Sequence, residues 1–449
     1  MTRRTIQAKC VDLDDFGRGI VRTENETCFV ENLLPGEEAI IETVYEYGKL
    51  QDCYIKERLT SSEDRVTPAC KFYPACGGCQ LMHLSYPKQL EYKQRKVKAL
   101  LHKFAHLDVE VLPTIGLENP TRFRNKVQKP VRVDLKRNKP IAGFYKTGTH
   151  QLISIDDCLM ESELSNRITN TLLRLFLKYD YYPFDEDSMT GTIRHILIKT
   201  SSINNKALVT LVSATTALQG QKDFAKELIS LCPEVVGVVL NINSRHTNVI
   251  LGPRDIEVFG KNRISDKIFD KEFLISSQSF YQTNTFQIET LYGKAIEFAQ
   301  VKETDTVLDA YCGTGTIGLS IADKVHGLVG VEINNSAVHD AIINAKVNNI
   351  RNAHFERDDA TDFMMRTKMK FDVIIMDPPR KGSTPEFIAA CKKILPRTII
   401  YVSCDPVTLA RDLALFDDTY EVTRVQPVDM FPNTMHVETI VLLSLKDSQ

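Results

Sequence analysis

The segment Val307-Leu-Asp-Ala-Tyr-Cys-Gly-Thr-Gly-Thr-Ile-Gly318 combines an apolar strand, a glycine-rich turn and the start of a helix. Glycine lets the backbone approach a ligand closely and turn sharply from strand into helix. The next expected strand ends in Glu332, 19 residues after Gly313, where a carboxylate can accept hydrogen bonds from ribose hydroxyls. This order of strand, loop, helix, strand and acid predicts a nucleoside-binding unit.

The acidic residues around this unit indicate which nucleoside it binds. Asp309 comes just before the turn, where its charge would oppose the pyrophosphate of a dinucleotide. A carboxylate there suits a cofactor with a cationic amino-acid end, such as S-adenosylmethionine. Asp359 follows a later strand and is expected near the adenine. The alternative, a purely structural strand-to-helix turn, is less favoured because Glu332 and Asp359 occur in order.

Helices and Val/Ile-rich strands alternate from residue 276 onward, which is typical of a parallel sheet covered by helices on both faces. We therefore expect an α/β Rossmann-like domain over residues 276–449. Its expected helices are 284–299, 317–322 and 336–348. Its expected strands are 306–310, 327–332, 353–356, 373–376 and 398–402.

The remaining residues predict two further domains, so the expected fold is multidomain. Residues 1–58 contain five short strands separated by glycine and proline turns, which favours a small antiparallel barrel of the kind that often binds oligonucleotides. Residues 59–275 begin with a cysteine-containing loop and continue as an α+β domain with a basic hairpin. Its other expected elements are helices 87–104, 162–179 and 221–231 and strands 195–200, 207–213, 237–241 and 247–251.

Two motifs follow buried strands of the C-terminal domain and are expected at the carboxyl edge of its sheet, where ligands bind. One is Asp377-Pro-Pro-Arg380, and the other is Ser403-Cys404-Asp-Pro406. A cysteine facing a methyl donor suggests methylation of carbon 5 of uracil, which is a poor nucleophile. Attack of the Cys404 thiolate on C6 makes C5 carbanion-like, and a base must then remove the C5 proton. Glu438 is the candidate base, and a merely buried thiol is the alternative for Cys404.

Charge and cysteine usage indicate the partners and the compartment. The net charge is only −2, but eight basic residues lie between Thr121 and Pro140. Such a cluster can neutralise RNA phosphates, although a solvated hairpin rim is an equal alternative. The expected RNA-binding residues are Arg122, Arg124 and Lys126. No apolar run could span a bilayer and the basic N-terminus has no secretory segment, so we expect a cytoplasmic protein without disulfides or membrane contact.

In these motifs the chain resembles the RNA 5-methyluridine methyltransferases, specifically the iron–sulfur 23S ribosomal RNA (uracil-5-)-methyltransferases. Asp377-Pro-Pro-Arg-Lys-Gly382, Ser403-Cys-Asp-Pro406 and His436-Val-Glu438 carry the resemblance, in order and spacing. The resemblance implies that Cys404 is the nucleophile, Glu438 is the base and 23S ribosomal RNA is the partner. It also assigns to the cofactor site Gln282, Tyr311, Glu332 and Asp377.

The same resemblance covers the N-terminal half. Residues 12–19 and 29–36 resemble the TRAM barrel, which grips RNA. Cys70, Cys76 and Cys79, with the distant Cys158, resemble the ligands of a [4Fe–4S] cluster. Zinc remains the alternative, since four thiolates also suit a tetrahedral ion.

Two other functions compete with this interpretation. A transfer RNA 5-methyluridine methyltransferase would share the chemistry of Cys404, but such enzymes are expected to lack both the barrel and the cysteine cluster. A non-catalytic RNA-binding or ribosome-assembly protein would not need Cys404, Glu438, Gln282 and Asp377 together. We expect no obligate protein partner.

Overall fold

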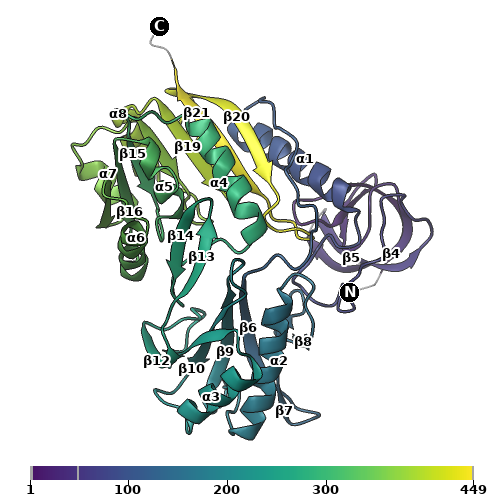
Figure 1. Ribbon diagram of the computed structural model, residues 1–449. Helices are drawn as coiled ribbons and strands as arrows, with labels where there is room; N and C mark the ends of the chain where they lie inside the picture. The colour runs from purple at the N-terminus through teal and green to yellow at the C-terminus, as the bar shows by residue number, and fades with distance from the viewer. Residues whose placement is uncertain (1–3, 48–49, 447–449) are drawn as a thin grey trace.

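The computed structural model describes residues 4–47 and 50–446, which form a closed barrel, two seven-stranded sheets and a two-stranded hairpin. Figure 1 shows the barrel beside the C-terminal domain, with the central domain below both. Among the described helices, none is long and apolar enough to cross a membrane.

The barrel consists of five strands, as the sequence predicts, in the order β1-β2-β3-β5-β4. Strands β3 and β5 pair in parallel and the other pairs are antiparallel. Three cysteines, Cys10, Cys28 and Cys53, lie in the apolar core of the barrel, so they serve packing. The strands are β1 Thr5–Leu13, β2 Gly19–Arg22, β3 Thr27–Val30, β4 Glu38–Tyr47 and β5 Leu50–Arg58.

The central domain packs helices α2 (Glu163–Lys178) and α3 (Gln221–Leu231) on a mixed sheet. The sheet has the order β12-β11-β10-β9-β6-β7-β8 and includes the expected basic hairpin, β6 with β7. Its strands are β6 Lys126–Asp134, β7 Lys139–Tyr145, β8 Leu152–Ser154, β9 Ile193–Thr200, β10 Ala207–Ser213, β11 Val235–Ile242 and β12 Arg254–Gly260.

The predicted strand over residues 247–251 is wrong, because these residues form a loop and the strand lies later, at β12. Asparagine side chains form hydrogen bonds with the backbone groups that would otherwise pair with a neighbouring strand. Asn243 Nδ2 donates to the carbonyls of Val249 (2.7 Å) and Ile250 (3.0 Å). Asn241 binds both the N–H and the carbonyl of Gly252. An apolar run can therefore stay out of a sheet when amide side chains satisfy its backbone.

The C-terminal domain has the sheet order β17-β16-β15-β18-β19-β21-β20, with five parallel strands followed by antiparallel β21 and β20. Its expected strands are confirmed. They are β15 Thr306–Ala310, β16 Gly327–Glu332, β17 Ala353–Arg357, β18 Val373–Met376 and β19 Thr398–Ser403; the last two strands are β20 Tyr420–Val428 and β21 Glu438–Leu445.

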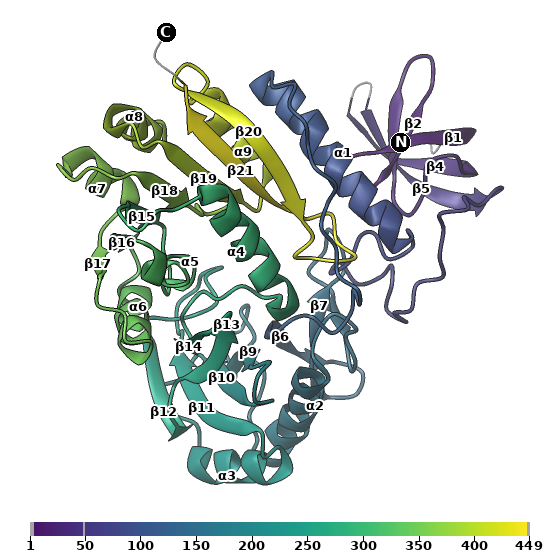
Figure 2. The same cartoon turned by 45° about the horizontal axis from the view of Figure 1, so that its top comes forward.

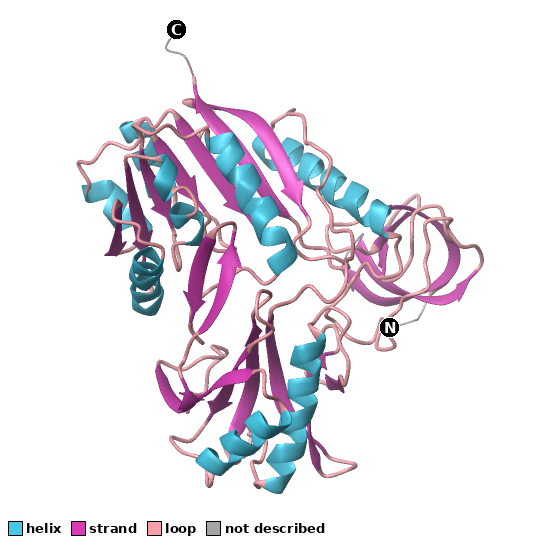
Figure 3. Ribbon diagram, in the orientation of Figure 1, coloured by secondary structure: helices cyan, strands magenta, loops and turns pink. Residues whose placement is uncertain are grey.

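Helices cover both faces of this sheet, as Figure 3 shows. Helices α4, α5 and α6 share one apolar core, and α1, α7, α8 and α9 share the core on the opposite face. The hairpin of β13 (Ile264–Ile268) and β14 (Lys271–Ile275) packs against α6. The helices are α4 Thr285–Ala299, α5 Thr316–Leu319, α6 Asn335–Val347, α7 Ala360–Arg366, α8 Pro385–Ile394 and α9 Pro406–Ala414, with a 3-10 turn at Ala322–Lys324.

Helix α1 (Tyr86–Ala105) lies in the stretch predicted as central domain, yet it packs on the C-terminal sheet beside α9 and β20 (Figure 2). Val97 and Leu101 are fully buried in the core of the C-terminal domain. Near the other end of α1, Tyr92 joins a small core with barrel residues Leu13 and Leu34. This helix therefore connects the barrel to the domain that carries the predicted active site.

Candidate active site

The predicted catalytic residues lie at one edge of the C-terminal sheet, because neighbouring strands end there in register. Met376 pairs with Tyr401 across β18 and β19, and Ser403 pairs with Thr439 across β19 and β21. Asp377, Cys404 and Glu438 are the adjoining residues. The sheet topology thus brings together three side chains that are up to 61 positions apart in the sequence.

Cys404 occupies a tight turn between β19 and α9. The Ser403 hydroxyl accepts from the Asp405 N–H (3.2 Å) and donates to its carbonyl (3.0 Å). The Asp405 carboxylate then caps α9 by accepting from Val407 N (2.9 Å). Burial and the nearby carboxyls of Glu438 and Asp377 raise the pKa of the Cys404 thiol to about 12. The thiol is therefore protonated at neutral pH until a substrate and a proton acceptor are in place.

Glu438 is buried at the start of β21, and its Oε2 has no hydrogen-bond partner. Burial raises its pKa well above the usual range; Asp377 adds to this effect and the Arg380 guanidinium opposes it. Burying a carboxyl oxygen without a partner is costly, so this residue contributes little to stability. Perturbed carboxyls of this kind concentrate at functional sites.

Two further carboxyls lie at the same edge, those of the buried Asp309 and the half-buried Asp377. Burial raises the pKa of both Asp309 and Asp377 to about 7. Asp309 also accepts from Gly318 N (2.9 Å), so it holds the start of α5 as well as facing the predicted cofactor site. A group of buried carboxyls fits a ligand that carries positive charge, as the sulfonium and ammonium groups of S-adenosylmethionine do. The hydroxyl of Thr314 is also buried without a partner in the glycine turn.

The glycine turn is fixed by the predicted ribose-binding acid. Glu332 accepts from Gly313 N (3.2 Å) and from Asn334 N (2.7 Å). Tyr311 starts the turn with a φ of 64°, a left-handed conformation that is unfavourable for a tyrosine. Its hydroxyl lies 3.0 Å from Ser383 Oγ, which fixes the side chain toward the segment that follows Asp377.

The other two predicted cofactor residues have structural contacts of their own. Asp359 caps α7 by accepting from Thr361 N (2.8 Å), and its charge acts on Tyr311. Gln282 is buried, and its backbone carbonyl accepts from Asn125 Nδ2 of the central domain (2.9 Å). The central domain therefore holds the segment that presents Gln282 to the C-terminal domain.

Sequence reasoning did not single out two residues of this edge. Arg380 stands in the quoted Asp-Pro-Pro-Arg motif, and its charge acts on both Glu438 and Cys404. Tyr292 on α4 is fully buried beside the carboxyls and bonds to Thr316 Oγ1 (3.1 Å). The motif itself pointed to Arg380, whereas no local pattern distinguishes Tyr292 from a core tyrosine.

The four predicted cluster cysteines, Cys70, Cys76, Cys79 and Cys158, line one cavity of about 80 Å³ with apolar side chains and Arg124. Burial, with the neighbouring thiols next in order, raises the pKa of Cys79 to about 12. Burial raises the pKa of Cys158 to about 11, with Glu161 adding to it. Within residues 4–47 and 50–446, no three His, Cys, Asp or Glu side chains converge closely enough for one metal ion.

The three predicted RNA-binding residues are largely engaged within the protein. Arg122 forms an ion pair with Asp157 (2.6 Å) and donates to the carbonyl of Cys158 (2.8 Å). The Arg124 guanidinium carbon lies 5.9 Å from the centre of the Phe431 ring. Burial lowers the pKa of Lys126.

This geometry defines a class of protein. A Rossmann-like sheet with a glycine turn, a ribose-binding acid and carboxyls at its carboxyl edge is that of an S-adenosylmethionine-dependent methyltransferase. Residues 85–446 match the tRNA (Uracil-5-)-methyltransferase family. The chain therefore belongs to the RNA (uracil-5-)-methyltransferase family and is an RNA methyltransferase.

Known proteins resemble the chain over nearly its whole length. An uncharacterized RNA methyltransferase of Clostridium tetani is 39% identical and covers 95% of this chain and 94% of its own length. Another, of Oceanobacillus iheyensis, is 39% identical and covers 97% of this chain and 95% of its own length. The crystal structure of Pyrococcus abyssi tRNA (uracil-54, C5)-methyltransferase with S-adenosyl-L-homocysteine has a TM-score of 0.79 at 27% identity, and the match covers 97% of this chain and 99% of that one.

The match to the Pyrococcus abyssi enzyme changes one expectation. It covers 97% of this chain and leaves about 13 of the 449 residues unmatched. The barrel of residues 5–58 is longer than that, so most of the barrel lies within the match. The expectation that transfer RNA enzymes of this kind lack the barrel is therefore wrong for this neighbour. The barrel alone does not separate a ribosomal from a transfer RNA substrate.

Proposed function

We propose that this enzyme transfers a methyl group from S-adenosylmethionine to C5 of a uridine in RNA through a covalent bond between Cys404 and C6. The observation that carries this proposal is the meeting of Cys404 and Glu438 at the paired ends of β19 and β21. A nucleophile and an unpartnered carboxyl beside the cofactor turn are the two groups that this chemistry requires.

The residues act in a fixed order. The Cys404 thiolate bonds to C6, and the C5–C6 π electrons then form a bond to a methyl carbon. The bound cofactor would supply that methyl group as an electrophile, its sulfur keeping the electron pair of the broken sulfur–methyl bond and leaving as a neutral thioether. The Glu438 carboxylate then removes the C5 proton, the C5–C6 double bond forms again, and the C6–Sγ bond breaks. The carboxyl of Glu438 must be ionised for this step, and the nearby cation of Arg380 favours that form. Asp309, Gly313, Glu332 and Asp359 hold the cofactor, and Gln282, Tyr311 and Asp377 orient it and the base.

We further propose 23S ribosomal RNA as the substrate, on the strength of the cysteine set that accompanies the catalytic motifs. Transfer RNA is the second candidate, because the Pyrococcus abyssi neighbour is a tRNA (uracil-54, C5)-methyltransferase. In either RNA, stacking hides C5 and C6, so the target base must leave the stack before Cys404 can reach it.

The four-cysteine cavity is proposed to hold a [4Fe–4S] cluster bound by Cys70, Cys76, Cys79 and Cys158. The shared lining of one cavity supports this proposal, because four thiolates that face one space can each bind one iron of a cubane. Anaerobically purified protein should be brown and contain four irons and four sulfides. Purified protein that contains zinc and no iron would refute the assignment.

The RNA surface is proposed to include the barrel and the basic segment around Arg122, Arg124 and Lys126. The contacts described above rank these residues. Arg124 is the strongest candidate, since Arg122 already has a carboxylate partner and Lys126 is half-buried with a lowered pKa.

Two experiments test the function. RNA containing 5-fluorouridine has no C5 proton to remove, so wild-type enzyme and cofactor should form a persistent covalent complex that Cys404→Ala cannot form. Mapping 5-methyluridine in ribosomal and transfer RNA from cells lacking the gene tests the substrate. Loss confined to transfer RNA would replace the ribosomal proposal by the second candidate.

A further inference from the structure

The loop of residues 429–437 connects β20 to β21 and delivers Glu438 to the active site. Val428 pairs with Glu438 at the base of the loop. Because Glu438 Oε2 has no hydrogen bond of its own, the position of this carboxyl depends on the backbone, which the pairing with Val428 and the adjoining loop hold. The contacts that hold the loop therefore bear directly on the proposed base.

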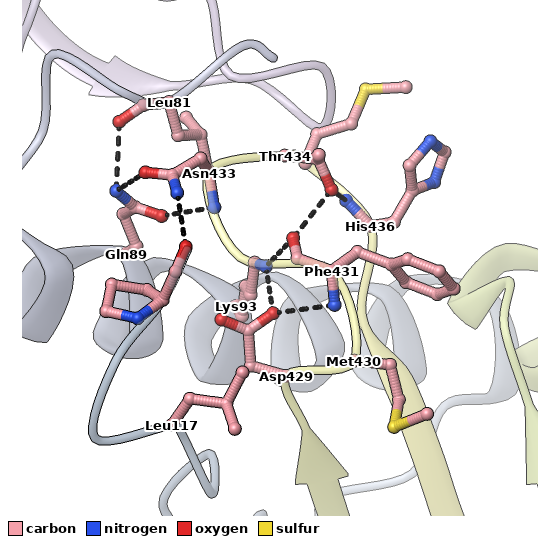
Figure 4. Close-up of polar contacts among 12 residues, drawn as sticks. Leu81, Gln89, Lys93, Leu117, Asp429, Met430, Phe431, Asn433, Thr434 and His436 are labelled. Atoms are coloured by element: carbon pink, nitrogen blue, oxygen red, sulfur yellow. Dashed lines mark hydrogen bonds and ion pairs between the residues drawn. The ribbon is translucent and has the colours of Figure 1, made fainter. Parts of the chain in front are cut away.

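Helix α1 holds the first half of the loop, as Figure 4 shows. The fully buried Lys93 ammonium donates to Asp429 Oδ1 (2.6 Å) and to the carbonyl of Phe431 (3.0 Å). Asp429 Oδ1 also accepts from Phe431 N (3.1 Å). This buried ion pair anchors residues 429–431 to α1, while the Phe431 ring contacts Arg124 of the cavity lining.

Asn433 holds the second half, and it joins α1 to another segment. Its N–H donates to Gln89 Oε1 (2.9 Å), while Gln89 Nε2 donates to Asn433 Oδ1 (3.2 Å) and to the Leu81 carbonyl (3.1 Å). Asn433 is buried and has a φ of 66°, a conformation that asparagine tolerates better than most residues.

The other segment is the wall of the cysteine cavity. Gln80 and Leu81, immediately after Cys79, both donate their N–H groups to the Asn433 carbonyl, each at 3.0 Å. Asn433 Nδ2 lies 3.6 Å from the sulfur of Met160, which lines the cavity two residues after Cys158. Asn433 thus contacts the chain next to two of the four cysteines.

We propose that Asn433 is a positioning residue through which the four-cysteine segment sets Glu438 for removal of the C5 proton. This inference rests on the proposed function. Cys404 lies on the turn between β19 and α9, outside the 429–437 loop, so attack on C6 does not depend on this contact. Loss of the contact, or of the metal centre that orders the segment, slows the release of product from Cys404 and leaves formation of the adduct unchanged.

Asn433→Gly tests the side-chain part of this role. Glycine keeps the left-handed backbone and the carbonyl contacts with Gln80 and Leu81, whereas alanine would add strain. The glycine variant removes only the side-chain contacts, which are those with Gln89, the Pro120 carbonyl and Met160. Asn349→Gly is the matched control, because Asn349 is exposed, has a φ of 57° and lies after α6, away from the loop.

The first measurement separates the two chemical steps. On 5-fluorouridine RNA, Asn433→Gly should form the covalent adduct within about twofold of the wild-type rate, because no proton is removed. On ordinary RNA, the same variant should accumulate the methylated adduct and turn over about tenfold more slowly, as a milder form of Glu438→Gln. Asn349→Gly should accumulate none.

The second measurement tests the cysteine segment without using activity. Removal of iron by a chelator should accelerate hydrogen exchange at the amides of Asn433, Met435 and His436 by about tenfold or more. The amide of Phe431, held by Asp429, and the amides of β15 should keep their protection.

The outcomes are distinguishable. If Glu438→Gln accumulates no adduct on ordinary RNA, the proposed function fails. If Glu438→Gln does so but Asn433→Gly slows both steps equally or neither, the positioning role of Asn433 is refuted. Unchanged exchange at residues 433–436 after iron removal would refute the role of the cysteine segment.

Discussion

Cys404 and Cys79, one of the four cysteines that line the cavity, share a raised thiol pKa but differ in their neighbours. Burial raises the pKa of both Cys404 and Cys79 to about 12. Cys404 faces the carboxyls of Glu438 and Asp377, whereas Cys79 faces Cys158 and Cys76. A thiol next to a proton acceptor suits transient bonding to a substrate, while thiols that face each other suit shared, lasting ligation. Neighbours, rather than burial or acidity, separate the two roles.

The largest expected effect tests the role of Cys404 as the nucleophile. Cys404→Ala should lower methyl transfer by about 10⁴-fold or more, because the step that activates C5 is lost. Radioactive methyl incorporation into RNA measures this loss. Cys391→Ala, which removes another buried cysteine of the same domain, should retain activity. Equal loss in both variants would show that packing, not nucleophilic attack, explains Cys404.

The second prediction concerns Cys79 as a ligand of the proposed metal cluster. Cys79→Ala should remove iron and lower the unfolding free energy by about 4 kcal/mol or more, since loss of a metal centre is among the largest single effects. Cys404→Ala should change it by about 1 kcal/mol or less, because that thiol is half-buried and binds no metal. Iron analysis and denaturant unfolding of both variants give the comparison. Equal stabilities would remove the distinction between the two regions.

A smaller effect concerns the carboxyls around Cys404. The folded pKa of Asp377, about 7, exceeds its unfolded value of about 3.9. The contribution of Asp377 to the free energy of unfolding is therefore complete at pH values below its unfolded pKa. This contribution is lost as the pH rises through the folded pKa of about 7. Between pH 5 and 8, wild-type protein should lose about 1–3 kcal/mol of stability relative to Asp377→Asn.

Subtraction of the variant is necessary, because buried histidines act in the opposite direction. Burial lowers the pKa of His83 to about 3 and those of His195 and His436 to about 4. Their contributions are therefore lost as pH falls below about 6.5. Denaturant unfolding across this range measures the difference, and parallel pH profiles for the two proteins would contradict the raised pKa of Asp377.

The smallest expected effect lies at the rim of the cysteine cavity. Arg122→Gln should change RNA affinity by less than about twofold and leave its salt dependence unaltered, because Asp157 already neutralises the guanidinium. Binding titrations from about 50 to 200 mM salt measure both quantities. A decrease of the salt slope by about one unit would show that Arg122 contacts a phosphate.

The sequence predicted those helices and strands that interactions between neighbouring residues determine. The strands ending at Ala310, Glu332 and Met376 were predicted because each is an apolar run that ends at or just before a residue expected in the cofactor site. The hairpin β13–β14 was missed, since its strands are only five residues long and neither alternates polar and apolar residues regularly. Helix α1 was predicted as an element, but its docking on the C-terminal sheet depends on contacts that no local pattern contains.

Some features of the active site could likewise be predicted from the sequence, and others could not. The positions of Asp377 and Cys404 at strand ends were predictable, because parallel strands end at one edge. The helix-capping contacts of Asp359 and the backbone contact of Asp309 with Gly318 were not, since a motif gives residue types and not their partners. Asn433 was missed because its partner Gln89 is 344 positions away.

The buried ion pair of Lys93 and Asp429 joins residues 336 positions apart, which has a consequence for biosynthesis. Ribosomes add about 5–20 residues per second, so α1 is made long before its partner. During translation the Lys93 ammonium must stay hydrated, and the apolar face of α1 must wait for a strand that has not been made. The barrel and the central sheet can fold as they emerge, but the active site can assemble only after residue 429 has left the ribosome.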